Sequence, residues 1–182
     1  MRKLLLPLMG IVLLVACNNE KPAEKKDAAV APATESKEAA PAEFADKKFG
    51  EMAGKQLDAL TAGDVDGWMS AYADNAVYVW NYGDSLAGKK AITDYWKNRR
   101  ANVIDSITFS NRVFLPVKVN KPQSVEQPGN WVLCWYLTNA KYKNGKRMVQ
   151  WIHTDIHYDA NDKIDRLIQY VDRSLINAAL AK

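Results

Sequence analysis

The stretch LTAGDVDGWMSAYADNAVYVWNYGDSLAGKKAITDYW, residues 60–96, decides the fold of this chain. Gly63 can end one helix, and Asp64 can cap the next. The run AVYVW, residues 76–80, is typical of a strand, because β-branched and aromatic residues favour a pleated surface. A turn-rich segment follows, and residues 89–100 then return to helical spacing. The stretch therefore predicts two helices, a strand and a third helix in that order.

The flanking segments extend this pattern. Upstream, apolar residues of 51–63 recur at helical spacing. Downstream of Ile104 the pattern changes to strands, with an Asn144-Gly145 hairpin signal. Three helices followed by long antiparallel strands are typical of an α+β fold. The expected strands and a short final helix occupy residues 106–120 (one long strand or two short ones), 131–143, 146–158, 164–171 and 174–182.

Short motifs in these elements resemble the nuclear transport factor 2-like superfamily, which includes the SnoaL-like polyketide cyclases and ketosteroid isomerase. They are Gly63-Asp64 between two helices, Tyr72-Ala73-Asp74 before the first strand, Gly88 before a helix carrying Ile92, and a C-terminal hairpin with Asp162 where glycine is usual. The resemblance covers residues 52–172. It implies a cone-shaped fold, in which a strongly curved antiparallel sheet wraps around the three N-terminal helices and leaves a pocket between them. It also implies a homodimer through the outer face of the sheet.

The resemblance places three residues of this chain where ketosteroid isomerase keeps its catalytic groups. Gln56 replaces the catalytic tyrosine, Trp80 replaces the aspartate that acts as general base, and Thr154 replaces the acid that is the second oxyanion donor. Tryptophan cannot accept a proton from a carbon acid, and glutamine and threonine are weaker oxyanion partners. Steroid isomerisation is therefore not expected, and the chain is interpreted as a non-catalytic binding protein in preference to an enzyme.

The segment QWIHTDIHY, residues 150–158, holds both histidines of the chain. In a strand, His153, Asp155 and His157 share one face. The resemblance places Thr154 facing inward, and its neighbours His153 and Asp155 then face the other way. The row is therefore expected on the convex outer surface, as polar surface or dimer contact. A catalytic or metal-binding row, or a register shifted by one residue, remains an alternative. No metal and no cofactor are expected, because Cys134 is the only other soft ligand within the domain.

The expected pocket lining comes from the carried-over positions and from strand parity. Its aromatic walls and few amides and hydroxyls suit a small apolar or amphipathic ligand. The alternative is that the aromatic residues fill a closed core. The predicted ligand-binding residues are Gln56, Tyr72, Tyr78, Trp80, Trp96, Trp135, Leu137, Asn139, Gln150, Ile152, Thr154 and Val171.

The N-terminal sequence MRKLLLPLMGIVLLVACNN has a basic start and an apolar run of about 12 residues, which suits a signal peptide. The run ends in a motif that resembles the lipobox of bacterial lipoproteins. In that family the cysteine receives a diacylglyceryl group, the peptide is cut before it, and the new amino terminus is acylated. An ordinary secretory signal is the alternative. We therefore predict a signal peptide over 1–16, lipidated Cys17 and a flexible tether over 17–43, and the domain over 44–182. The expected location is the cell envelope. Asn18, not aspartate, follows the lipidated cysteine, and in a Gram-negative cell this resembles lipoproteins that are sent to the outer membrane.

The formal charge of +4 is modest, and no basic run indicates a nucleic-acid partner. Three functions follow. The first is a lipid-anchored protein that binds a small ligand. The second is a SnoaL-like enzyme of isomerase, cyclase or hydrolase type, for which Asp172 is the weak candidate acid–base residue. The third is an interaction module that uses the convex sheet.

Overall fold

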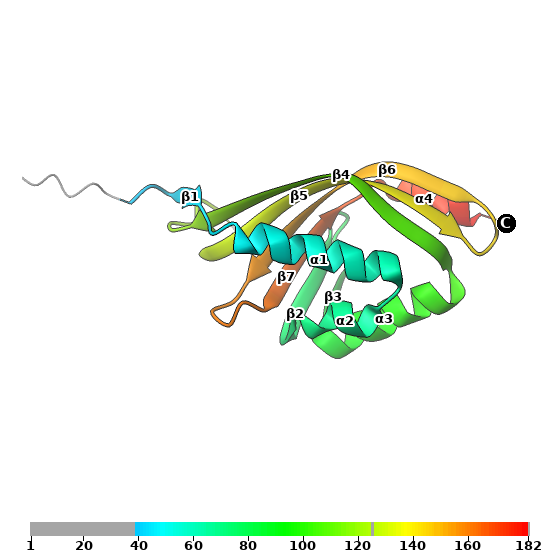
Figure 1. Cartoon of the computed structure of the whole chain (residues 1–182), viewed down its shortest axis with the longest axis horizontal. Helices are drawn as coiled ribbons and strands as arrows, with labels where there is room; N and C mark the ends of the chain where they lie inside the picture. The colour runs from blue at the N-terminus through cyan, green and yellow to red at the C-terminus, as the bar shows by residue number, and fades with distance from the viewer. Residues whose placement is uncertain (1–38, 125, 182) are drawn as a thin grey trace, which may run out of the picture. The chain divides into compact units, whose positions relative to one another are not determined.

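The structure is a computed structural model that describes residues 39–124 and 126–181. Over these residues the chain forms one seven-stranded sheet in the order β1-β4-β5-β6-β7-β2-β3. The predicted α+β fold with a curved sheet is confirmed, since the long strands arch over α1, α2 and α3 (Figure 1). The elements are β1 (Ala42–Phe44), α1 (Lys48–Ala62), α2 (Val65–Ser70), β2 (Tyr72–Trp80), β3 (Ser85–Ala87), α3 (Lys89–Asn102), β4 (Ile104–Val119), β5 (Gly129–Tyr142), β6 (Arg147–Tyr158), β7 (Ile164–Tyr170) and α4 (Arg173–Leu180).

The junction of α1 and α2 forms as the sequence predicts. Gly63 ends α1 with φ 79°, a left-handed conformation that glycine adopts without strain. The Asp64 carboxylate then accepts a hydrogen bond of 2.8 Å from the Gly67 N–H. A Cβ atom at position 67 would lie 2.0 Å from Asp64 Oδ2 and clash with it, so only glycine allows the Asp64 carboxylate to cap the helix in this position.

The three longest strands make the curved wall of the cone. β4 is one continuous strand, which settles the choice between one strand and two. Its pairing with β5 shifts between Ser110 and Val113, where Asn111 has φ 50°. Such bulges bend a strand and increase its twist.

Strand β7 pairs in the sheet in a way that differs from the predicted antiparallel pattern. It pairs antiparallel with β6 but parallel with β2, so that Tyr78 lies opposite Leu167. The turn before β7 holds Asp162 at φ 58°. Asparagine and aspartate tolerate this conformation better than other side chains do, which explains how aspartate stands where glycine is usual.

The sheet begins before the predicted domain boundary at residue 44. β1 pairs with β4, with Ala42 opposite Val119, so the last residues assigned to the tether belong to the sheet. The predicted signal peptide and Cys17 lie outside the described residues. No helix within residues 39–124 and 126–181 is long and apolar enough to cross a membrane.

The core lies between the concave face of the sheet and the three covering helices. Trp68 of α2 is 2% exposed, and its ring lies 5.0 Å from that of Tyr72 and 5.3 Å from that of Trp96, both edge-on. Edge-to-face contacts of this kind add to the hydrophobic gain from burial. This aromatic cluster forms one wall of the cavity described next.

Candidate functional site

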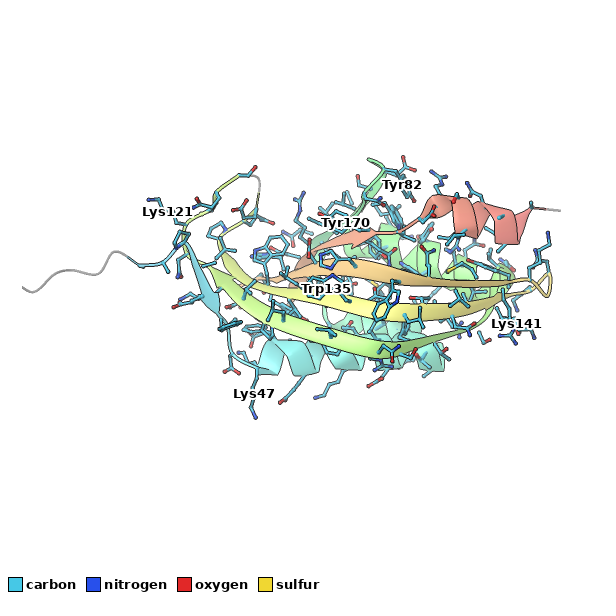
Figure 2. The ribbon with its side chains drawn as sticks, turned by 90° about the horizontal axis from the view of Figure 1, so that it is seen from above. Lys47, Tyr82, Lys121, Trp135, Lys141 and Tyr170 are labelled. Carbon is cyan, nitrogen blue, oxygen red and sulfur yellow. The ribbon has the colours of Figure 1, made fainter. Side chains whose placement is uncertain are left out.

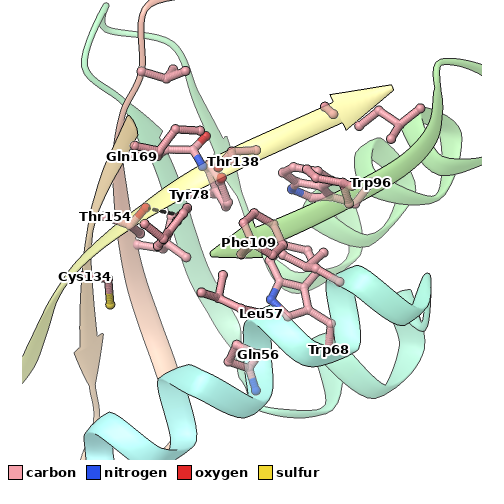
Figure 3. A pocket seen from close by; sticks show the side chains of 18 of the residues that line it. Gln56, Leu57, Trp68, Tyr78, Trp96, Phe109, Cys134, Thr138, Thr154 and Gln169 are labelled. Carbon is pink, nitrogen blue, oxygen red and sulfur yellow. Dashed lines mark hydrogen bonds between the residues drawn. The ribbon is translucent and has the colours of Figure 1, made fainter. Parts of the chain in front are cut away.

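A cavity lies between α1, α2, α3 and the concave face of the sheet (Figure 3). Its volume is about 80 Å³, counted over the positions open to the centre of a water-sized sphere. A single water needs about 10–15 Å³ on this measure, so the cavity has room for several waters or a small organic molecule. Most of its lining is apolar, including Leu57, Trp68 and Phe109.

Four polar side-chain atoms of this lining are buried and have no hydrogen-bond partner within the described residues. They are Gln56 Oε1, Tyr72 Oη, Trp96 Nε1 and Thr138 Oγ1. They come from α1, β2, α3 and β5, so they surround the cavity from different elements. A buried polar group without a partner costs roughly 1–3 kcal/mol. Their grouping around one apolar space indicates an occupant that supplies hydrogen bonds.

A second polar group of the lining is internally satisfied. Tyr136 Oη and Thr154 Oγ1 lie 2.6 Å apart in a hydrogen bond (Figure 3). Burial raises the pKa of Tyr136, and the hydrogen bonds with Thr154 and Gln169 offset only part of that rise. Burial likewise raises the pKa values of Tyr72 and Tyr78 well above their usual range. These phenols therefore stay neutral at physiological pH, when they can donate a hydrogen bond but cannot act as a base.

The lining holds no carboxylate and no imidazole, and its one formally charged side chain is Arg99. Cys134 also lines the cavity, but it is 1% exposed, and burial raises the pKa of its thiol. A thiol that stays protonated is a poor nucleophile. The cavity can therefore bind and orient a molecule, and it lacks an evident general base.

The structure brings seven of the twelve predicted ligand-binding residues to the cavity. They share an inward direction on the helices or on the concave face of the sheet. They are Gln56, Tyr72, Tyr78, Trp96, Ile152, Thr154 and Val171. Whether they contact a ligand stays a prediction.

Trp80 and Gln150 are buried but lie behind the lining instead of in it. The indole N–H of Trp80 donates a hydrogen bond of 3.2 Å to Oε1 of Gln169, which itself lines the cavity. The Gln150 amide holds the backbone of Asp172: its Oε1 accepts from the Asp172 N–H at 3.0 Å, and its Nε2 donates to the Asp172 carbonyl at 3.2 Å. Both were predicted in the lining, and both serve instead to support it.

Trp135, Leu137 and Asn139 were also predicted in the lining, and this is wrong. The alternate residues of β5 face the cavity instead, with Tyr136 and Thr138 at 4% and 1% exposure. Trp135 is 36% exposed on the convex face, where its ring stacks on His153 at 4.6 Å. Trp135 lies opposite His153 in the β5–β6 pairing, and a residue opposite an outward histidine itself points outward.

Asp172, the candidate acid–base residue, caps a helix. Its Oδ1 accepts hydrogen bonds from the Ser174 N–H at 2.8 Å and from the Ser174 hydroxyl at 2.7 Å. The pKa of the Asp172 carboxyl is lowered, first by the Ser174 hydroxyl and then by the Ser174 backbone N–H. The side chain is exposed and absent from the cavity lining, so the structure gives it no role there.

The expected face of the His153 row is confirmed for its first two members. Trp151 is 57% exposed, and His153 Nε2 lies 2.7 Å from Asp155 Oδ1 on the same convex side. Burial raises the pKa of Asp155, and the interaction with His153 opposes that rise. Within residues 39–124 and 126–181, no three histidine, cysteine or acidic side chains gather as a metal site would need.

His157 departs from the expectation of an outer surface. It is 5% exposed, because its Nδ1 lies 2.5 Å from Asp165 Oδ1 and its Nε2 lies 3.1 Å from the Pro128 carbonyl oxygen. The ring of Trp131 also packs on it, with 4.8 Å between centroids. The loop before β5 therefore covers this end of the convex face.

The uncovered part of the convex face carries large apolar side chains. Trp135 and Tyr170 lie on it in the view of Figure 2, and Trp151, Val113 and Val149 are more than half exposed. The homodimer expected through this face stays a prediction. Light scattering of the purified protein would test it by giving the mass of one chain or two.

Comparison with known proteins bears on this fold and cavity. The sequence of residues 53–166 matches the family of SnoaL-like domains. No curated protein matches the chain. Solved structures with similar folds include a candidate polyketide cyclase from Xanthomonas campestris, at 14% identity over 74% of this chain and 98% of that chain with a TM-score of 0.60.

Two further structures have the same fold. A candidate isomerase from Bacillus subtilis is 19% identical, covers 74% of this chain and 93% of its own, and has a TM-score of 0.58. A hypothetical protein with a ketosteroid isomerase-like fold from Catenulispora acidiphila, in complex with trimethylamine, is 15% identical over 71% of this chain and 91% of its own, with a TM-score of 0.53. Identities this low show a shared fold and leave activity open. The family match covers more than half of the chain, and this protein belongs to the family of SnoaL-like domains.

Proposed function

We propose that the domain binds a small, mostly apolar molecule in its cavity and does not transform it. The observation that supports this most is the set of four unpartnered polar atoms around an apolar cavity that has no carboxylate or imidazole in its lining. Sites for small molecules combine apolar walls with a few polar groups that fix orientation. A related structure, that of the Catenulispora protein, contains the small molecule trimethylamine.

The expected affinity is modest. Burying about 150 Å² of apolar ligand surface at about 25 cal/mol per Å² gives roughly 4 kcal/mol of gross driving force. The loss of ligand freedom opposes this gain, so a small hydrophobe should bind at about millimolar to micromolar concentrations. Hydrogen bonds from the unpartnered atoms would then select between ligands of similar size.

Tryptophan fluorescence tests the proposal directly, because Trp68 and Trp96 line the cavity. We expect some members of a panel of small aromatic and aliphatic alcohols and amides to change the emission saturably. The response should fall strongly in Trp96→Phe. It should persist in Trp151→Phe, because that tryptophan lies on the convex face. A panel without any saturable response, or a response that disappears in Trp151→Phe alone, would contradict binding in the cavity.

An enzyme of isomerase or cyclase type is the second candidate. The observation that favours it is the Tyr136–Thr154 hydrogen bond in the lining, since a positioned phenol can stabilise a developing oxyanion. Product formation from a ligand found by the fluorescence panel, lost in Tyr136→Phe while binding remains, would establish catalysis and overturn the non-catalytic proposal.

We further propose that Cys17 is lipidated and anchors the protein in the cell envelope, from the motif of residues 14–17. Several acyl chains hold a protein on a membrane, where one chain gives only marginal binding. We expect Cys17→Ser to move the protein from the detergent phase to the aqueous phase on phase partitioning. Continued partitioning of the variant with detergent would show that another segment anchors the chain.

A further inference from the structure

We propose that the ligand of this cavity carries an anionic group, a carboxylate in its simplest form, which Arg99 binds at the α3 side of the cavity. This inference rests on the proposed function, because it names the chemical class of a ligand that the cavity must first be able to bind. The ligand expected is an amphipathic acid with an apolar body.

Arg99 lacks the acidic partner that two of the other four cations of α3 have; Lys89 and Arg100 also form no ion pair among the described residues. Lys90 pairs with Asp94 at 2.6 Å, and Lys97 pairs with Asp66 at 2.7 Å, both on the surface. Arg99 is half-buried and lines the cavity. Among the residues that the structure describes, no ion pair involves it.

The surroundings of Arg99 are aromatic and neutral. Its guanidinium carbon lies 5.7 Å from the centroid of the Tyr95 ring. It is also close enough to Tyr142 for its charge to lower the pKa of that phenol, against burial, which raises it. A guanidinium can stack on aromatic rings and still present its N–H fork to a carboxylate. A partly buried cation without an ion pair lacks the counter-charge that such groups usually have.

The position of Arg99 in the last turn of α3 does not by itself explain where its side chain lies. A cation there interacts favourably with the carbonyl end of the helix. Arg100 offers the same interaction from the same turn, and it packs over Gly63, where a Cβ atom would lie 2.7 Å from its Nη2. Arg100 does not line the cavity, whereas Arg99 does.

A second donor stands beside Arg99 on the same face of α3. Trp96 precedes it by three residues, a spacing that places two side chains next to each other on a helix. The indole of Trp96 is 9% exposed, and its Nε1 has no partner among the described residues. Indole and guanidinium groups are donors only. This side of the cavity therefore offers unfilled donors, and a carboxylate supplies acceptors for both.

The test compares two probes of the same shape, butyrate and butyramide, which differ in charge and are small enough for the cavity. Calorimetric titration uses the full chain with Cys17→Ser, so that no detergent competes for the cavity, at pH 7 and constant ionic strength. We expect butyrate to bind at least about tenfold more tightly than butyramide, as a charge-assisted pair implies. Arg99→Gln should remove this preference and leave the affinity for butyramide nearly unchanged.

Lys97→Gln is the matched control, because it removes one positive charge from the same helix at an exposed position. It should keep the preference for butyrate. Equal affinity for the two probes, or a preference that survives in Arg99→Gln, would overturn the anionic ligand while the binding function stands. Failure of both probes to bind, together with a silent fluorescence panel, would overturn the binding function itself.

Discussion

Replacing Trp68 with alanine is expected to lower the free energy of unfolding by about 3–5 kcal/mol. The side chain is 2% exposed, and it joins α2 to Tyr72 of β2 and Trp96 of α3 through edge-on ring contacts. The substitution removes those contacts and enlarges the cavity that already lies beside them. Folded domains are stable by about 5–15 kcal/mol, so this is a large share of the total. Urea denaturation followed by far-ultraviolet circular dichroism measures the loss.

Trp151→Ala is the control for the same change in chemistry at the surface. Trp151 is 57% exposed on the convex face, so its removal should change stability by at most about 0.5 kcal/mol. Similar losses at the two positions would mean that the aromatic cluster of α2, β2 and α3 is not the stabilising core. A small loss in both would mean that the domain collapses readily around the missing indole.

Asp165→Ala is expected to cost about 3 kcal/mol, because it removes one partner of a nearly buried pair. Asp165 Oδ1 lies 2.5 Å from His157 Nδ1, and their side chains are only 19% and 7% exposed. The other ring nitrogen is already held by the Pro128 carbonyl oxygen at 3.1 Å. The substitution therefore leaves His157 Nδ1 without its hydrogen-bond partner where water has little access. The same denaturation measurement reports the cost.

Asp94→Ala is the control, because it breaks an ion pair almost as short as the Asp165–His157 pair but exposed. It therefore shows whether burial, and not the distance between the partners, sets the cost. Asp94 Oδ2 lies 2.6 Å from Lys90 Nζ, but these side chains are 62% and 89% exposed. Surface pairs contribute little, so this variant should stay within about 0.5 kcal/mol of the parent. If Asp165→Ala were equally mild, the loop before β5 would have to admit water to His157.

Local chemistry made several features predictable from the sequence. A glycine followed by a capping aspartate, Gly63-Asp64, specifies its own turn, and the structure confirms it. The alternation along β6 was also clear, since Ile152 and Ile156 share a face with Thr154 while Trp151 does not. Each of these inferences depends on residues a few positions apart.

The inward face of β5 was predicted wrongly for two reasons. Both faces of this strand carry apolar residues, and the turn before β6 is one residue longer than the sequence signal suggests. A two-residue turn at Asn144-Gly145 would place Trp135 opposite Thr154, facing the cavity. The observed loop spans residues 143–145, because the Tyr142 N–H donates to the Lys146 carbonyl oxygen at 2.9 Å, and Trp135 then lies opposite His153. One extra residue sends every side chain of the strand to the other face.

The misplaced Trp80 and Gln150 depended on contacts between distant parts of the chain. Trp80 donates a hydrogen bond to Gln169, which pairs with it across the parallel β2–β7 contact and lines the cavity in its place. The side-chain oxygen of Gln150 accepts a hydrogen bond from the backbone N–H of Asp172, just after β7. Neither contact follows from periodicity, since both require the position of β7 in the sheet. Burial could be predicted for these residues, and their separation from the cavity could not.

The parallel pairing of β2 with β7 also determines when the domain can form. β2 ends at Trp80, and its partner β7 begins only at Ile164, so most of the domain must be synthesised before this pairing can occur. Contacts between residues so far apart in the chain slow folding, because a long loop must close before the contact stabilises anything. Until then β2 has only the short β3 beside it, and its other edge is open to pairing with another chain. The nascent domain therefore depends on its last strand to protect its first long one from aggregation.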